Sequence, residues 1–194
     1  MRNRETSEPN HGEFEPMKTK KVETVLVVGG GSGMGRAVAT ELCTQGMRVF
    51  VADLNQATAE ETAQASTCTN GPAEAFQVDV SSSTSVSSLY KRLHEKTERL
   101  DLLVHTAGIL GRTVFIEDMS DEEWRQMITI NLDGVFFCCR EAVRWMKAHQ
   151  TGRIILFNCL ILTVPLSSTV SSMMMADMWS PFHKIRSRWI DPCA

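Results

Sequence analysis

The feature that most constrains the fold is a glycine-rich segment at residues 29–35, Gly-Gly-Gly-Ser-Gly-Met-Gly, between an apolar run and a stretch of helical spacing. We expect residues 24–28 to form a buried strand and residues 33–45 the helix that follows. Glycines at such a junction permit a tight turn, and the helix N-terminus offers amides and a positive dipole end to a pyrophosphate. A plain strand-to-helix turn also collects glycine, so the segment alone leaves both interpretations open.

Short apolar runs alternate with amphipathic stretches of helical length up to residue 157. We expect further strands at 47–52, 73–78, 102–104 and 153–157, and helices at 55–65, 84–97 and 120–149. Gly46 is expected to end the first helix, Ser120 and Glu123 have the form of a capping box, and a kink is expected at Gly134. The alternation predicts an α/β protein with a Rossmann-type, doubly wound parallel sheet that is incomplete at its C-terminal end.

The chain of 194 residues is expected to form one globular domain with two atypical ends. Residues 1–22 are polar and charged and are expected to form a disordered leader, with Met1 and Met17 as candidate starts. Residues 23–159 form the expected Rossmann dinucleotide-binding domain. Residues 160–194 are a tail rich in Ser, Met and Trp, in which no further βαβ unit can be drawn.

Charges of both signs are scattered along the chain, with a net charge of −3. No basic face is expected, which argues against nucleic acid and anionic lipid as partners. The longest apolar stretch, residues 154–166, is interrupted by Asn158 and is too short for a membrane span, which needs about 20 residues. We therefore expect a soluble protein with no membrane partner.

The six cysteines show no Cys-x-x-Cys spacing and no paired histidines. Neither a metal site nor a disulfide framework is expected from this pattern. Reduced thiols and a cytoplasmic location fit it best.

Asp53 ends the second expected strand, 18 residues after Gly35. A carboxylate at this point is placed to accept hydrogen bonds from an adenosine ribose, and it would repel a 2′-phosphate. The alternative role for Asp53 is a helix N-cap before Leu54 and Asn55. Together with the glycine turn, Asp53 predicts a nucleotide site that favours NAD over NADP.

The glycine spacing Gly29-x-x-x-Gly33-x-Gly35 resembles that of the short-chain dehydrogenase/reductase family and differs from the Gly-x-Gly-x-x-Gly of many other Rossmann enzymes. Three further motifs follow in the order of the family: Asp79-Val80, His105-Thr106-Ala107-Gly108, and Asn131 within Ile130-Asn131-Leu132-Asp133-Gly134. The resemblance covers about residues 24–159. It includes two departures, Val28 for the usual threonine and His105 for the usual asparagine.

The resemblance implies a set of cofactor contacts around the glycine turn and the strand ends that follow it. The implied contacts are Gly29, Ser32, Gly33, Met34, Gly35, Asp53, Leu54, Asp79, Val80, His105, Ala107 and Gly108. Asp79 would hydrogen-bond the adenine, and the chain from His105 to Gly108 would line the ribose through its backbone. Taken singly, Asp79 also suits a helix start, and His105 a strand end whose ring is satisfied.

Reduction of a carbonyl requires a proton donor beside the oxygen, and the family uses Tyr-x-x-x-Lys with an upstream serine. The resemblance places Cys159 at the serine position, and the tyrosine and lysine positions fall near Ser172 and Ala176, so neither residue type is present. Asn131 stands where the family holds a water that links its lysine to solvent.

Other acid/base candidates are few. Tyr90 is the only tyrosine and is expected on a helix far from the strand ends. Lys184, beside His183, is the only lysine after residue 157, and a surface charge explains it better than a rearranged acid/base pair.

The resemblance therefore implies an NAD(P)-dependent oxidoreductase acting on a small alcohol or carbonyl, of which this chain is a truncated and catalytically impaired form. A non-catalytic nucleotide-binding or interaction protein, whose tail contacts a partner, is the alternative. Strand five is expected to be an exposed edge, so the chain is expected to aggregate or to need a partner. The family often dimerises through the helices beside strand five, so residues 133–149 are candidates for homo-oligomer formation, with packing against the sheet as the alternative.

Overall fold

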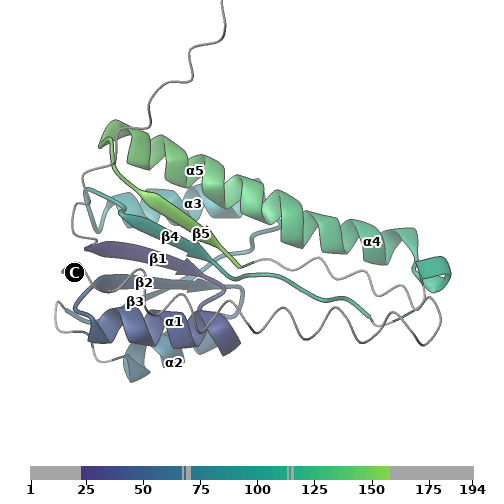
Figure 1. Cartoon of the computed structure of the whole chain (residues 1–194), viewed down its shortest axis with the longest axis horizontal. Coiled ribbons are helices and arrows are strands. Elements are labelled where there is room, and N and C mark those ends of the chain that lie inside the picture. Colours follow the sequence, from purple (N-terminus) through teal and green to yellow (C-terminus); the bar gives the residue numbers. More distant parts are fainter. Residues whose placement is uncertain (1–22, 67, 69–70, 113, 115, 158–194) are drawn as a thin grey trace, which may run out of the picture.

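The computed structural model describes residues 23–66, 68, 71–112, 114 and 116–157 (Figure 1). Five strands form one parallel sheet: β1 (Thr24–Val28), β2 (Arg48–Asp53), β3 (Glu74–Gln77), β4 (Leu102–His105) and β5 (Arg153–Leu156). Their order is β3-β2-β1-β4-β5, so the chain winds outward from β1 to one edge and then crosses back to β4. This order confirms the predicted α/β class and Rossmann-type doubly wound sheet.

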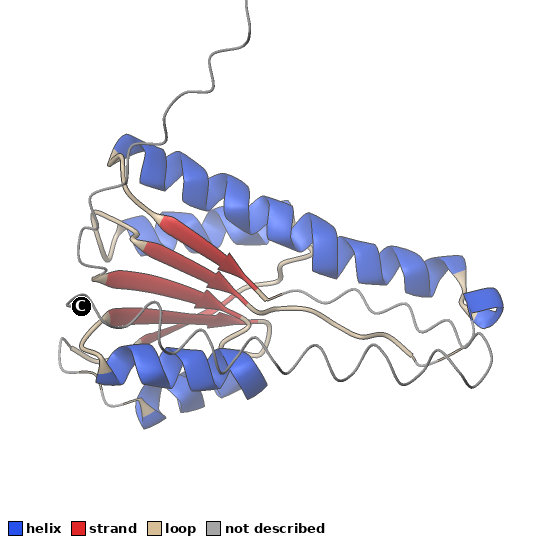
Figure 2. Ribbon diagram, in the orientation of Figure 1, coloured by secondary structure: helices blue, strands red, loops and turns tan. Residues whose placement is uncertain are grey.

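Helices cover both faces of the sheet (Figures 1 and 2). One face carries α1 (Gly33–Thr44) and α2 (Gln56–Ala65), and the other carries α3 (Ser83–His94) and α5 (Gly134–Ala148). Alternate residues of β1 enter two separate cores, with Val25 and Val27 in one and Leu26 and Val28 in the other. All five residues of β1 are buried, which explains its continuous apolar run.

The ends of the helices follow the local signals in the sequence. Gly46 follows α1 with φ at +79°, the left-handed conformation expected of a residue that ends a helix. The predicted capping box opens α4 (Asp121–Ile128): Ser120 Oγ accepts from the amide of Glu123 at 3.2 Å, and Glu123 Oε2 accepts from the amide of Ser120 at 2.8 Å. A 3-10 turn (Ile116–Asp118) precedes it.

The kink expected at Gly134 takes the form of a π-helical turn, Thr129–Asp133, which joins α4 to α5. Gly134 itself begins α5, and a Cβ added there would lie 3.0 Å from the Cβ of Val80. The glycine therefore permits close packing of α5 on the segment after β3. The change from α4 to α5 takes place in the wider π-helical turn before it.

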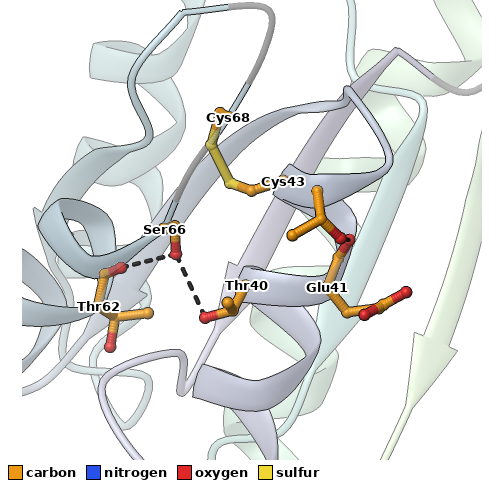
Figure 3. The surroundings of a disulfide bond; sticks show 7 residues. Thr40, Glu41, Cys43, Thr62, Ser66 and Cys68 are labelled. Carbon is orange, nitrogen blue, oxygen red and sulfur yellow. Dashed lines mark hydrogen bonds between the residues drawn. A yellow bond between two sulfur atoms is a disulfide. The ribbon is translucent and has the colours of Figure 1, made fainter.

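The prediction that the cysteines form no disulfide is wrong. Cys43, near the end of α1, is bonded to Cys68, in the segment after α2 (Figure 3). The sequence pattern gave no sign of this pair because 25 residues separate the two cysteines, and only the packing of α1 beside α2 on one face brings them together. Cys138 and Cys139 are free thiols.

β5 forms one edge of the sheet within the described residues, as expected of strand five. Ile155 and Leu156 on this strand are 44% and 47% exposed. In the described part of the chain, no helix has both the length and the apolar character needed to cross a bilayer. No group of three His, Cys, Asp or Glu side chains is placed to hold a metal ion among these residues.

Candidate functional site

The glycine turn connects the carboxyl end of β1 to the start of α1. Gly29 and Gly33 have φ angles of +82° and +51°, a region that disfavours other residues. A Cβ on Gly29 would lie 2.5 Å from the amide nitrogen of Ala107, and a Cβ on Gly35 would overlap the carbonyl oxygen of Gly29. A Cβ on Gly33, in contrast, would meet no atom within 4 Å. Two glycines therefore permit close backbone packing, while the third leaves open space in front of the helix.

The N-terminus of α1 faces this open space with unsatisfied amides. Ser32 is the N-cap residue, but its exposed side chain makes no capping hydrogen bond. The first amides of an α-helix have no partner within the helix, and they carry the positive end of its dipole. The start of α1 is therefore suited to an anion.

A cavity of about 380 Å³ lies over the carboxyl ends of β1, β2 and β4 and beside the segment after β3. It is lined by every predicted cofactor contact except His105, that is Gly29, Ser32, Gly33, Met34, Gly35, Asp53, Leu54, Asp79, Val80, Ala107 and Gly108. The other lining residues are Val28, Val78, Thr106, Ile109 and Ile130. A cavity of this size falls in the range of small-molecule sites, and it lies where ligands bind in open α/β sheets.

Asp53 presents a fixed carboxylate at the end of β2. Its Oδ2 accepts from the amide of Gly31 at 2.9 Å, and its Oδ1 accepts from the amide of Asn55 at 3.1 Å. The N-cap of α2 is Asn55, whose side chain accepts from the amides of Ala57 and Thr58. Asp53 is thus oriented toward the glycine turn, and the alternative role of a helix cap falls to Asn55.

Asp79 lines the cavity and is not the residue that caps the helix after β3. Its Oδ1 accepts from the amide and the hydroxyl of Ser81, at 2.9 and 2.6 Å. Ser82 caps α3 by accepting from the amide of Ser85. The Asp79 carboxylate therefore stiffens the loop after β3 and remains part of the cavity wall.

His105 is the one predicted cofactor contact that does not line the cavity. Its side chain is 0% exposed, and neither ring nitrogen has a hydrogen-bond partner among the described residues. Burial lowers its pKa from 6.5 to about 4. Its carbonyl oxygen accepts from the amide of Phe157 at 2.8 Å, which extends the contact between β4 and the chain after β5. Within the described residues the ring is therefore not satisfied, and its burial makes His105 a neutral core residue.

Asn131 supports the cavity wall from the π-helical turn. Its Oδ1 accepts from the amide of Ile109 at 2.8 Å, and its Nδ2 donates to the carbonyl of Ile109 at 2.7 Å. These two bonds fix the loop after β4, where Ile109 lines the cavity. A role for Asn131 in a proton relay stays a prediction, and Cys159 lies outside the described residues.

The only tyrosine lies away from the cavity, as expected. The Tyr90 hydroxyl donates to the carbonyl of Cys138 at 2.9 Å, between α3 and α5. The side chain is 3% exposed, and burial raises its pKa well above the ordinary value of 10. Tyr90 is therefore a core residue that is not placed to donate a proton to a ligand in the cavity.

Sequence reasoning missed two side chains that hold the glycine turn. Arg36 Nε donates to the carbonyl of Gly31 at 3.1 Å, and Thr106 Oγ1 donates to the carbonyls of Val28 and Gly29 at 2.9 and 3.1 Å. The only signals were the position of Arg36 directly after the last glycine and of Thr106 within the motif after β4. Both residues satisfy carbonyl groups of the turn, so that its amides stay directed at the cavity.

Three features define a Rossmann-type α/β protein. They are a parallel sheet that reverses its winding beside β1, a glycine turn at a helix N-terminus and a carboxylate at the end of β2. A family model described as short chain dehydrogenase matches residues 23–170. The chain belongs to the short-chain dehydrogenase family, whose members bind the dinucleotide NAD(P). The match extends past residue 159, the predicted end of the domain, into residues outside those described.

Curated relatives are oxidoreductases of this family. A 3beta-hydroxysteroid dehydrogenase of Mediterraneibacter gnavus is 37% identical over 123 residues, which are 63% of this chain and 45% of the relative. A 3-oxoacyl-[acyl-carrier-protein] reductase of Synechocystis sp. is 35% identical over 140 residues, which are 72% of this chain and 56% of the relative. The chain thus spans about half the length of the curated relatives it matches.

Solved structures give the same result for the fold. A 3-ketoacyl-ACP reductase from Sinorhizobium meliloti 1021 aligns with a TM-score of 0.65 at 32% identity, covering 69% of this chain and 52% of the other. The relatives found by sequence and the solved structure therefore agree on the family and on the parallel sheet.

Proposed function

We propose that the cavity binds an adenine dinucleotide, with the diphosphate at the N-terminus of α1, the ribose at Asp53 and the adenine beside Asp79. The observation that carries the proposal is the cavity itself, which gathers nearly all of the predicted contacts from four separate segments. A Cβ at position 33 would project into open space in front of the helix. The glycine therefore leaves this space free for the diphosphate. A negative group there would meet the helix amides, and no carboxylate atom of the described residues lies within 4 Å of the position of a Cβ on Gly33.

The proposed preference is for NAD over NADP. The carboxylate of Asp53 is half-buried and held by two amides, so it is in place before any ligand arrives. Ribose hydroxyls can donate to it, whereas a 2′-phosphate would bring a second negative charge to the same point. The repulsion is expected to weaken NADP by about 1.4 kcal/mol or more, which is about tenfold in affinity.

Calorimetric titration of the full chain with NAD and with NADP tests this proposal. The substitution Asp53→Asn removes the charge but keeps an oxygen that can accept from Gly31. We expect the variant to lose most of the preference for NAD, while Asp121→Asn, on the exposed start of α4, leaves the ratio unchanged. An unchanged ratio in Asp53→Asn would contradict the assigned role of this carboxylate.

We further propose that these 194 residues belong to an oxidoreductase lineage acting on alcohols or carbonyls but do not turn over on their own. When bound, NAD would accept a hydride from the substrate. Hydride transfer also requires a proton donor or acceptor at the substrate oxygen. The names of the relatives, hydroxysteroid dehydrogenase and 3-oxoacyl reductase, support the alcohol and carbonyl class. The burial of Tyr90 supports the absence of turnover, which makes a nucleotide-binding or interaction protein the second candidate.

The absence of turnover is measured by NADH oxidation with the purified full chain and a panel of ketones. No oxidation above the protein-free rate is expected. Turnover that depends on the chain and disappears with Gly33→Ala would overturn this proposal, because it would require an acid/base pair outside the described residues.

We also propose that residues 133–149, which contain α5, mediate homo-oligomer formation and that the protein is cytoplasmic. Leu132, Phe136 and Val143 are 61%, 56% and 50% exposed and lie four and seven residues apart, which places them on one side of the helix. Exposed apolar side chains gathered in this way favour contact with a partner surface. The proposed cytoplasmic location rests on the spacing of the cysteines in the sequence, and the disulfide between Cys43 and Cys68 argues against fully reduced thiols.

A further inference from the structure

The disulfide links the end of α1, whose first residues line the cavity, to the segment after α2. Cys43 lies in the last turn of α1 and is 0% exposed, and Cys68 is half-buried just after α2 (Figure 3). The bond encloses the segment that contains β2 and α2, including Asp53 at the end of β2. The carboxylate assigned to the ribose therefore lies within the closed segment.

Besides the ion pair of Arg36 with Glu61, three contacts in a row join α1 to α2 and to the residues after it. Arg36 Nε donates to Thr62 Oγ1 at 3.0 Å, the hydroxyls of Thr40 and Ser66 lie 3.3 Å apart, and the disulfide follows at Cys43. Positions 36, 40 and 43 are four and three residues apart, so they lie on one side of α1. Figure 3 shows the second and third contacts side by side. The disulfide is thus the covalent end of a continuous row of contacts.

The first contact of this row touches the glycine turn. Arg36 donates to the carbonyl of Gly31 as well as to Thr62, and the amide of Gly31 donates to Asp53. A shift of α2 relative to α1 would therefore displace the turn and the carboxylate together. Loss of the bond at Cys43 frees the far end of the same interface.

We propose that Cys43 and Cys68 form a reversible oxidation site whose disulfide state orders the glycine turn and thereby strengthens dinucleotide binding. The effect on binding rests on the proposed function, whereas the effect on the turn does not. In the reducing compartment proposed above, disulfides are typically transient or redox-sensing. Cys68 is partly exposed and Cys43 is fully buried, so a thiol reagent would approach the bond from the side of Cys68.

The chemistry is thiol–disulfide exchange. In reduction, a thiolate of a dithiol attacks Cys68 Sγ, the bond to Cys43 Sγ breaks, and the Cys43 thiolate takes a proton. The second thiol of the reagent then displaces Cys68, which also ends as a thiol, and the reagent leaves as a cyclic disulfide. In oxidation, one molecule of oxidised glutathione accepts two electrons from the two cysteines and leaves as two molecules of reduced glutathione.

Hydrogen exchange of the full chain tests the proposal, after incubation with oxidised glutathione or with dithiothreitol. Differential alkylation and mass spectrometry first establish the state of both cysteines. We expect exchange at residues 29–36 to be at least about fivefold faster in the reduced protein, and NAD affinity to be at least about fivefold lower. By reciprocity, NAD is expected to make the disulfide harder to reduce by the same factor.

Two variants separate the pair from general effects of the reagents. Cys68→Ser is expected to resemble the reduced protein under both conditions, while Cys139→Ser, which changes a free thiol on α5, is expected to respond like the wild-type chain. The proposal is overturned if both cysteines are alkylated after incubation with oxidised glutathione, or if exchange at residues 29–36 is the same in both states. If neither state binds NAD, the proposed function fails, and the exchange rates still decide whether the disulfide orders the turn.

Discussion

The buried ring of His105 makes the stability of the fold depend on pH in a defined window. Its pKa falls from 6.5 to about 4 because the ring is fully buried, which disfavours its charged form. Above pH 6.5 the ring is neutral in both the folded and the unfolded chain, so its titration costs no stability. As the pH falls below 6.5, the unfolded chain binds a proton that the folded chain does not, and the folded state loses stability until the pH approaches 4.

The size of the loss follows from the two pKa values. Between pH 7.5 and pH 5, His105 is expected to lower the free energy of unfolding by about 2 kcal/mol. The substitution His105→Leu removes the titrating group, and it also removes two unpaired polar atoms from the core, so it is expected to be neutral or stabilising at pH 7.5. His105→Asn, which carries the residue usual in the family, provides a second variant that does not titrate.

Urea denaturation followed by circular dichroism at several pH values between 7.5 and 5 measures this effect. We expect the free energy of unfolding of either variant to fall by about 2 kcal/mol less than that of the wild-type chain over this range. His149→Leu, which replaces an exposed histidine after α5, serves as the control and is expected to keep the wild-type profile. A constant difference between wild type and both His105 variants would refute the reasoning from burial.

Two other predictions concern the cavity and the exposed apolar side chains of α5. Gly33→Ala is expected to weaken NAD binding by about tenfold or more in a calorimetric titration, because its Cβ would enter the space assigned to the diphosphate. Gly71→Ala is its control, since Gly71 also has a positive φ and open space around it but lies outside the cavity lining, and equal losses in both variants would indicate backbone strain alone. Phe136→Asp is expected to shift the full chain to a smaller species in light scattering, and an unchanged mass would contradict self-association through this side of α5.

The sequence predicted the elements of the sheet well because each one carries a local signal. The fully buried β1 has a continuous apolar run, Gly46 ends α1, and the capping box at Ser120 opens α4. The cavity was predictable for a related reason. Parallel strands present their carboxyl ends at one edge of the sheet, so motifs that follow successive strands meet there.

The remaining features depend on packing that no local pattern encodes. The disulfide between Cys43 and Cys68 depends on the position of α2 beside α1. The missing partners of the His105 ring depend on what surrounds it in the core, and a strand-end histidine looks the same in sequence whether or not it is satisfied. The two hydrogen bonds between Asn131 and the backbone of Ile109 depend on the π-helical turn. From the sequence, this turn was predicted only as a kink.

A crystal structure of the full chain grown with NAD would test the central claim most directly. The account predicts the diphosphate against the amides of residues 32–35, the ribose hydroxyls on the Asp53 carboxylate and the adenine beside Asp79. Electron density for NAD at any other place, or none in the cavity at a saturating concentration of NAD, would contradict the claim that this cavity is a dinucleotide site.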